Sequence, residues 1–174
     1  MSPARATPPR RTRVITDSPI GPLTLLAVNG SLAGLYMEGR EPEGPDGLVP
    51  ADSTDDANAL VLDETARQLE EYFAGQRRNF DLPLGLEGTS FQRQVWEALL
   101  DIPFGETTSY GKLASEIGRP TAARAVGMAN GSNPVSIIVP CHRVVGSNGS
   151  LTGYGGGLDR KQRLLDMERQ VSQH

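Results

Sequence analysis

The chain contains a single cysteine, Cys141, and two histidines in 174 residues. One cysteine excludes an internal disulfide framework, and one cysteine with two histidines cannot assemble an ordinary four-ligand zinc site. A chain of this length can bury an adequate core without such crosslinks, as one domain or as two small domains that share a surface. We therefore expect a fold held by packing alone, with no metal and no cofactor, in a reducing compartment such as the cytoplasm.

Residues 1–12, MSPARATPPRRT, are basic and rich in proline. This composition predicts a flexible, solvated tail, because it offers few apolar side chains to bury. The segment lacks the apolar stretch of a signal peptide, and no run in the chain is long enough to span a membrane. We expect no association with membranes.

Residues 13–85 predict a small N-terminal α/β domain that begins with a short antiparallel sheet. Asn29-Gly30 stands between two apolar runs, a pattern typical of a two-residue hairpin turn. The predicted strands are the runs at residues 13–18, 23–28 and 32–37.

The remainder of this domain predicts a loop, a helix and a further strand. The polar stretch 39–56 is rich in Gly, Pro and Asp, which predicts a mobile loop. Apolar side chains then recur at helical spacing over residues 56–74, and Gly75 ends the helix. Residues 77–84, RRNFDLPL, predict one more strand before a boundary at 85–88. The apolar face of the helix contains Leu62, Ala66, Leu69 and Phe73.

Residues 88–174 predict a mainly helical C-terminal domain. Thr89 and Gln92 fit a capping box at the start of a helix that runs to Ile102. Trp96 falls on the apolar side of this helix, so we interpret it as a core residue rather than a platform for stacking bases. The predicted apolar stripe comprises Phe91, Val95, Leu99 and Ile102, widened by Trp96 and Leu100.

Two short helices follow, with a tight turn between them. The first is predicted over residues 109–117 and ends at Gly118; the second is TAARAVGMAN, with Pro120 in its first turn and Gly131 after it. Such a pair is a weak signal for a helix-turn-helix unit, and many pairs of this size only pack together. A last helix is predicted over RKQRLLDMERQ, residues 160–170, with Leu164, Leu165 and Met167 in the core.

The net charge of −4 is unevenly distributed between the two halves. Residues 1–87 carry 8 basic and 14 acidic side chains, whereas residues 88–174 carry 9 and 7. A polyanion would therefore prefer the second half, although an excess of two positive charges identifies no partner by itself.

Cys141 is followed directly by His142 and Arg143 in the stretch SIIVPCHRVVG. A neighbouring imidazole or cation favours the thiolate, which is the reactive form of cysteine. However, adjacent residues on a regular strand point to opposite faces, so contact between the thiol and the imidazole requires an irregular backbone or a bridging water. From chemistry alone, a nucleophile and an inert buried thiol remain equally open.

The string PCHRV, with NPVSIIV before it and GYGGG after it, forms an extended motif around Cys141. This motif resembles the active-site signature of the O6-alkylguanine-DNA alkyltransferases, also called methylated-DNA–protein-cysteine methyltransferases. The resemblance extends through FQRQVWEALLDIPFGETTSYGKLA, ARAVGMANGSNP and GGLDRKQRLLDME, over about residues 88–170. It implies a ribonuclease H-like N-terminal domain and a C-terminal domain with a winged helix-turn-helix, and hence an α+β fold.

The resemblance also implies a role for each matching residue. Cys141 would accept the alkyl group from guanine O6, and His142 would remove the thiol proton through a water while Glu168 orients the imidazole. Asn133 would brace this network, and Tyr110 would protonate or stabilise the departing guanine. The substrate pocket would be formed by Pro140, Val144, Val145, Tyr154, Gly155 and Gly156. Gly155 stands where some relatives carry serine, so a hydroxyl contact with guanine would be lost there.

The implied partner is double-stranded DNA that contains O6-alkylguanine. The damaged base must leave the stack before its O6 can react, and Arg124 matches the arginine that takes its place. The helix around Arg124 would enter the minor groove, which its small residues suit. The implied DNA-binding residues are Arg124, Tyr110, Ala123, Ala125, Gly127, Asn130 and Ser109. We expect a monomer and leave open whether it binds DNA cooperatively.

The predicted function is direct-reversal repair, in which Cys141 irreversibly takes the alkyl group from O6-alkylguanine and, less readily, from O4-alkylthymine. The thioether product cannot be hydrolysed, so each molecule would act once. The alternatives are an alkyltransferase-like damage sensor, which lacks the cysteine, and a winged-helix regulator without catalysis. A cysteine hydrolase is disfavoured because the other histidine, His174, ends the chain.

Overall fold

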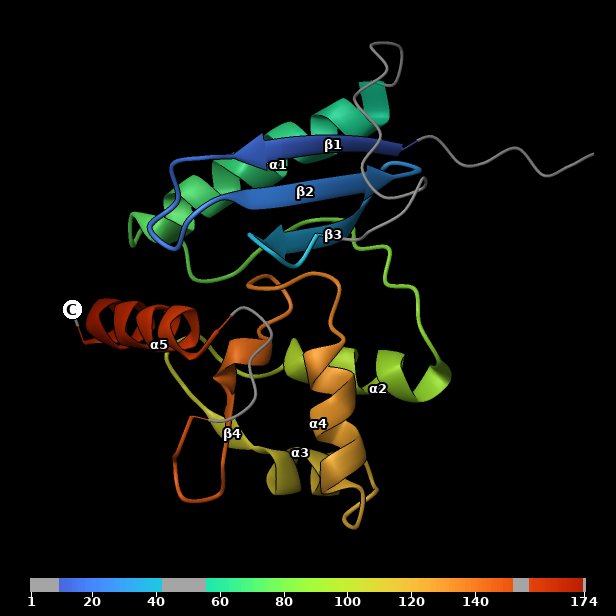
Figure 1. The fold of residues 1–174 in the computed structure, drawn as a ribbon, viewed down its shortest axis with the longest axis vertical. Coiled ribbons are helices and arrows are strands. Elements are labelled where there is room, and N and C mark those ends of the chain that lie inside the picture. Colours follow the sequence, from blue (N-terminus) through green and yellow to red (C-terminus); the bar gives the residue numbers. More distant parts are fainter. Residues whose placement is uncertain (1–9, 42–55, 152–156, 174) are drawn as a thin grey trace, which may run out of the picture.

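The computed structural model describes residues 10–41, 56–151 and 157–173. They form an N-terminal unit of three strands and one helix, placed above a mainly helical C-terminal unit (Figure 1). The predicted α+β fold, with a small antiparallel sheet followed by a helical domain, is confirmed. No helix in the described part of the chain has the length and apolar character needed to cross a membrane.

The sheet consists of β1 (Arg10–Ile15), β2 (Leu23–Val28) and β3 (Ser31–Met37), antiparallel and in sequence order. Asn29 and Gly30 have φ values of 56° and 78°, the left-handed conformation that a tight hairpin turn demands at both positions. The hairpin prediction is therefore confirmed. β1 begins at Arg10, opposite Val28, so residues 10–12 belong to the sheet and not to the expected tail.

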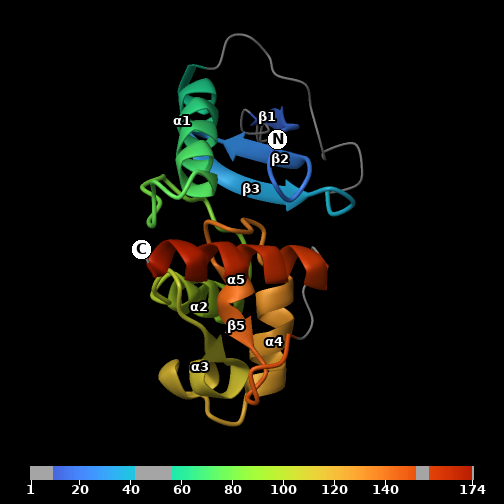
Figure 2. The ribbon, with the colours of Figure 1, turned by 90° about the vertical axis from the view of Figure 1, so that its left-hand side faces the viewer.

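Helix α1 (Asp56–Phe73) covers one face of this sheet (Figure 2). Its buried stripe includes Leu62 and Leu69, as predicted, whereas Phe73 is only half-buried. Tyr72, beside it, is fully buried and was not expected in the core. Most of the loop expected over residues 39–56 lies outside the described residues.

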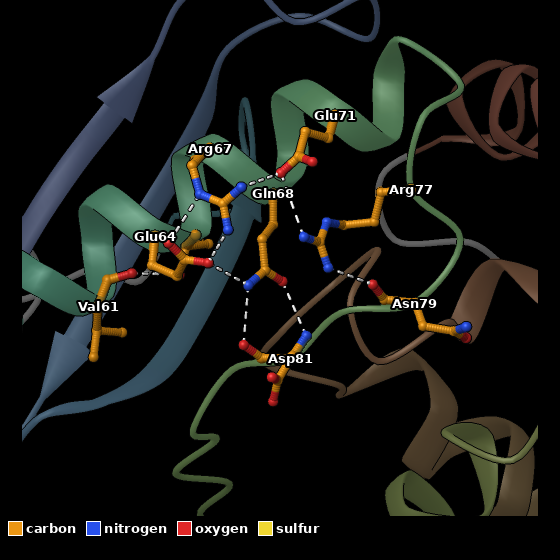
Figure 3. A network of polar contacts seen from close by, with 9 residues as sticks. Val61, Glu64, Arg67, Gln68, Glu71, Arg77, Asn79 and Asp81 are labelled. Carbon is orange, nitrogen blue, oxygen red and sulfur yellow. Dashed lines mark hydrogen bonds and ion pairs between the residues drawn. The ribbon is translucent and has the colours of Figure 1, made fainter.

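The chain leaves α1 through a segment fastened by polar contacts (Figure 3). The Gln68 side chain accepts a hydrogen bond from the backbone amide of Asp81 at 2.9 Å and donates one to the backbone carbonyl of Asp81 at 3.0 Å. The strand predicted at 77–84 is wrong: only Leu84 forms an isolated bridge, with Leu32 of β3. Pro83 lacks an amide hydrogen, so this segment cannot continue a full ladder along β3.

Helix α2 (Ser90–Leu99) has the predicted capping box, in which the Thr89 and Gln92 side chains each accept a hydrogen bond from the other residue's backbone amide. Trp96 is buried and donates from Nε1 to the carbonyl of Ala129 at 2.8 Å, which confirms its place in the core. Leu100 was expected on the apolar stripe, but it is the C-cap of the helix and is 44% exposed.

Helices α3 (Tyr110–Glu116) and α4 (Ala123–Gly131) form the expected helix pair. The Ser109 hydroxyl caps α3 by accepting from Lys112 N at 3.1 Å. Pro120 lies before α4, in the connecting turn, so the expectation that it occupies the first helical turn is wrong. The short strands β4 (Thr108–Ser109) and β5 (Val144–Val145) pair in parallel, and α5 (Leu158–Ser172) closes the fold.

The two units share a surface at the edge of β3. The amide of Leu35 donates to the carbonyl of Pro134 at 2.9 Å, and the amide of Ser136 donates back to Leu35 at 3.3 Å. Figure 1 shows the orange loop after α4 rising to meet β3 at this point. The sheet therefore supports the segment that leads directly to Cys141.

Candidate active site

Cys141 is the first residue of a short 3₁₀ helix, η1 (Cys141–Arg143), and is 3% exposed. The chain reaches it through two tight turns. The amide of Cys141 donates to Val139 around Pro140, and the amide of Ile138 donates to Ser136 around Ile137, both at 2.8 Å. Ile137 has a φ of 72°, which is unusual for a β-branched residue and marks a strained backbone beside the thiol. Cys141 and His142 themselves lie in the 3₁₀ helix and not on a regular strand, so the irregular backbone expected for this pair is present.

His142 is completely buried, and its Nε2 lies 2.7 Å from Glu168 Oε2. An ionised carboxylate only accepts hydrogen bonds, so Nε2 carries the hydrogen and Nδ1 keeps its lone pair. Nδ1 is buried and has no hydrogen-bond partner among the described residues. Glu168 thus holds the imidazole in the tautomer whose basic nitrogen is Nδ1.

Glu168 is also bound by Arg143, which donates from Nε to Oε1 at 2.8 Å and from a terminal nitrogen to Oε2 at 3.1 Å. Burial raises the pKa of this carboxyl, but the hydrogen bonds and charges of His142 and Arg143 more than offset it and hold the pKa at about 2. Tyr72 adds a third donor, with its hydroxyl 2.5 Å from Oε2. Glu168 is therefore an anion throughout the physiological range.

Burial lowers the pKa of His142 from its ordinary value, aided by the positive charges of Arg143 and Lys161. The hydrogen bond and charge of Glu168 act in the opposite direction without reversing the shift. His142 is consequently neutral at neutral pH. A neutral, oriented imidazole on the residue that follows Cys141 is suited to accept the thiol proton through a bridging water.

Two asparagines brace the backbone around Cys141. Asn133 donates from Nδ2 to Val139 O at 2.8 Å and accepts from Val135 N at 3.0 Å, so it holds the loop that precedes the thiol. Asn130 donates to the carbonyl of Cys141 itself at 3.3 Å. Asn130, which was expected among the DNA-binding residues, is 2% exposed, and its side chain supports the site from inside.

Lys161 is a buried cation next to this site that the sequence interpretation overlooked. It is completely buried, and its Nζ donates to the carbonyl of Val144 at 2.6 Å. Burial lowers the pKa of Lys161, and the negative charge of an ionised Cys141 raises it. The same coupling favours the thiolate. A signal was available, because Lys161, Leu164, Leu165 and Glu168 follow the i, i+3, i+4, i+7 spacing of one helix face.

The remaining predicted residues lie around η1 and on the helix pair. Arg124 and Ala125 are exposed on α4, whereas Ala123 and Gly127 are half-buried. A Cβ on Gly127 would lie 3.7 Å from the Tyr110 ring, so this glycine packs beside the tyrosine. Three of the predicted pocket residues are buried and lie close to Cys141 in the sequence: Pro140, Val144 and Val145. The other three, Tyr154, Gly155 and Gly156, lie outside the described residues.

Comparisons with known families agree with this arrangement. Residues 13–86 match the family model for the 6-O-methylguanine DNA methyltransferase ribonuclease-like domain, and residues 90–170 match the model for its DNA binding domain. The two matches define a protein in which a ribonuclease-like domain precedes a DNA binding domain.

Relatives that match most of the chain share about half of its residues. A methylated-DNA--protein-cysteine methyltransferase of Mycolicibacterium paratuberculosis is 52% identical over 90% of this chain and 91% of its own length. Its counterpart in Methanosarcina acetivorans is 50% identical over 88% and 96%. The crystal structure of Mycobacterium tuberculosis OGT in complex with DNA is 51% identical, with a TM-score of 0.82 over 92% of this chain and 94% of that one. The chain belongs to the 6-O-methylguanine DNA methyltransferase family.

Proposed function

We propose that this protein repairs duplex DNA by direct reversal, moving the alkyl group of O6-alkylguanine, and less readily of O4-alkylthymine, to the sulfur of Cys141. The buried contact between His142 and Glu168 carries this proposal, because it sets a base with its lone pair on Nδ1 directly after the only cysteine. Relatives that are 50–52% identical to this chain bear the name methylated-DNA--protein-cysteine methyltransferase.

The reaction requires the thiol to lose its proton as the sulfur attacks. His142 Nδ1 accepts this proton through a bridging water while Glu168 stabilises the imidazolium. The sulfur–carbon bond then forms as the carbon–O6 bond breaks, and the electron pair of that bond stays with guanine. Tyr110 donates a proton to the departing base, and the imidazolium of His142 releases the thiol proton to solvent as the tyrosine regains one, so the proton lost by the thiol is balanced by the proton gained by guanine. Lys161 favours both the thiolate and the departing anion by its positive charge.

The damaged base reaches Cys141 only after it has rotated out of the helix, at a cost of a few kcal/mol. The helix pair supplies the DNA-binding surface, with α4 in the minor groove and Arg124 in the space that the base leaves. Ala125 is exposed next to Arg124 and permits close approach of the helix to DNA. Pro140, Val144 and Val145, with the residues that follow β5, form the pocket.

The protein acts once. The product is a thioether on Cys141, and the chain has no second cysteine to which the group could move. We assign the N-terminal domain to residues 13–85 and the acceptor domain to 88–174, and we place the activity in the cytoplasm on chromosomal DNA. A damage sensor or regulator without catalysis is disfavoured, because either would have no use for an oriented base beside a thiol.

A titration tests this function. Increasing amounts of protein are added to a duplex with one O6-methylguanine, and the remaining modified base is measured after enzymatic digestion. One equivalent of protein is expected to restore one equivalent of guanine and then stop. Continued turnover, or no loss of O6-methylguanine, contradicts the proposal.

A further inference from the structure

Glu168 receives a hydrogen bond from the other half of the fold. Tyr72 lies in the last turn of α1, 96 residues before Glu168, and its hydroxyl donates to Glu168 Oε2 at 2.5 Å. Both side chains are completely buried. The N-terminal unit thus touches the residue that orients His142.

The ring of Tyr72 is held in place by other aromatic side chains. Its centroid lies 5.2 Å from that of Phe73 and 5.3 Å from that of Phe80. Phe104, from the C-terminal half, meets it edge-on at 6.1 Å. The edge-to-face contacts with Phe73 and Phe104 fix the plane of the tyrosine ring, so the hydroxyl is held at a defined position.

The end of α1 is itself fastened to the chain that follows it. Gln68, one turn before Tyr72, forms a two-way hydrogen-bond pair with the backbone of Asp81 (Figure 3). Arg77 donates to the carbonyl of Asn79 at 3.0 Å in the same connection. These contacts limit the movement of the last turn of α1, and therefore of Tyr72.

We propose that Tyr72 is a positioning residue for alkyl transfer, which holds the carboxylate of Glu168 against His142 from the N-terminal domain. Glu168 Oε2 accepts from His142, Arg143 and Tyr72, and Oε1 accepts from Arg143 and, at 3.4 Å, from Gly105 N. Tyr72 is the donor to this carboxylate that comes from the N-terminal unit, so without it Glu168 is held only by the donors of the C-terminal half, His142, Arg143 and Gly105. The inference rests on the proposed role of His142 as the base.

The hydroxyl also moderates the strength of the contact between Glu168 and His142. A donor to Oε2 draws negative charge away from the imidazole, so its loss stabilises the imidazolium and moves the protonation of His142 to higher pH. Among the described residues, the other charged groups that act on His142 are Arg143 and Lys161, and Tyr72→Phe leaves both of them in place. An imidazole that is already protonated cannot accept the thiol proton.

The test compares Tyr72→Phe with Tyr36→Phe, which removes a half-buried hydroxyl from β3 of the same domain. Single-turnover methyl transfer is measured at saturating duplex between pH 5.5 and 8. The ratio of the rates at pH 6 and pH 8 is expected to fall at least about threefold in Tyr72→Phe, with unchanged DNA affinity, and to stay constant in Tyr36→Phe. The chain has two histidines, so an NMR titration with His142→Gln as assignment control follows His142 directly.

The titration midpoint of His142 is expected to move to higher pH in Tyr72→Phe. An unchanged rate profile and midpoint would overturn the inference, even if the unaltered protein transfers methyl groups normally. Failure of the unaltered protein to transfer any group would instead reject the proposed function. If Tyr72→Phe does not fold, Phe73→Leu, which loosens the tyrosine ring, is expected to shift the profile in the same direction. An effect of Tyr72→Phe that persists in a Glu168→Gln background would show that the hydroxyl does not act through Glu168.

Discussion

Lys161 Nζ lies 2.6 Å from the carbonyl oxygen of Val144, so a fully buried cation on α5 is bonded to the strand that follows the acceptor helix. Burial lowers the pKa of Lys161 and the negative charge of an ionised Cys141 raises it, so the ammonium in turn favours the thiolate. Lys161 is the only lysine on α5. It therefore joins two functions: it fixes the backbone of β5 and favours ionisation of the thiol.

We predict that Lys161→Met slows single-turnover methyl transfer by about tenfold at pH 7, which corresponds to about 1.4 kcal/mol, because the thiolate loses the positive charge that favours it. The pKa of Cys141, followed by iodoacetamide labelling against pH, is expected to rise. Arg169→Met removes an exposed cation from the same helix and serves as the control. Equal rates in Lys161→Met and the unaltered protein would exclude the electrostatic role.

Arg124 is exposed on α4, where it can act on DNA but not on Cys141 directly. We predict that Arg124→Ala weakens repair of an O6-methylguanine duplex by more than tenfold and leaves transfer from free O6-benzylguanine nearly unchanged, since free base needs no flipping. Arg93→Ala, an exposed arginine on α2, controls for the loss of one positive charge. Equal losses on both substrates would refute the flipping role.

The His142–Glu168 pair makes stability depend on pH in one direction. The pKa of His142 in the folded protein lies below its ordinary value of 6.5. As the pH falls from 6.5 toward the folded pKa, the unfolded chain takes up a proton that the folded protein does not, so the free energy of unfolding decreases. The folded pKa of Glu168 is about 2 against an ordinary value of 4.5, so stability present above 4.5 is lost as the pH falls toward 2.

We therefore predict that the free energy of unfolding in urea decreases steadily from pH 7 to pH 3. The Glu168 contribution lost below pH 4.5 is on the order of 3 kcal/mol. His142→Gln is expected to flatten the decrease between pH 6.5 and 4.5, and circular dichroism follows each transition. A protein that gains stability between pH 7 and pH 5 would contradict the assigned charge states.

Local sequence patterns predicted those parts of the fold that local chemistry determines. The Asn29-Gly30 hairpin, the Thr89 capping box and the buried Trp96 depend on residues a few positions apart, and each is confirmed. The strand expected at 77–84 failed because its backbone pairs with β3 at only one position, a matter of tertiary placement. Pro120 was misplaced because the turn before α4 is longer than the pattern indicated.

The site shows the same division. The composition drew attention to Cys141, because it is the single cysteine of the sequence. Glu168 was assigned only through the family resemblance, because by itself it reads as an ordinary exposed charge on a helix. Tyr72 is separated from Glu168 by 96 residues, and no spacing rule connects the two. The resemblance placed Asn130 among the DNA-binding residues, whereas the structure buries its side chain, which donates to the carbonyl of Cys141.

The central claim is that Cys141 is the alkyl acceptor, and the intact mass of the protein tests it most directly. The protein is incubated with a duplex that contains O6-methylguanine and is compared with Cys141→Ser by mass spectrometry, followed by peptide mapping. We predict the addition of one methyl group, about 14 Da, on the peptide containing Cys141 and none in Cys141→Ser. An unchanged mass, or a methyl group that persists in Cys141→Ser, would contradict the account.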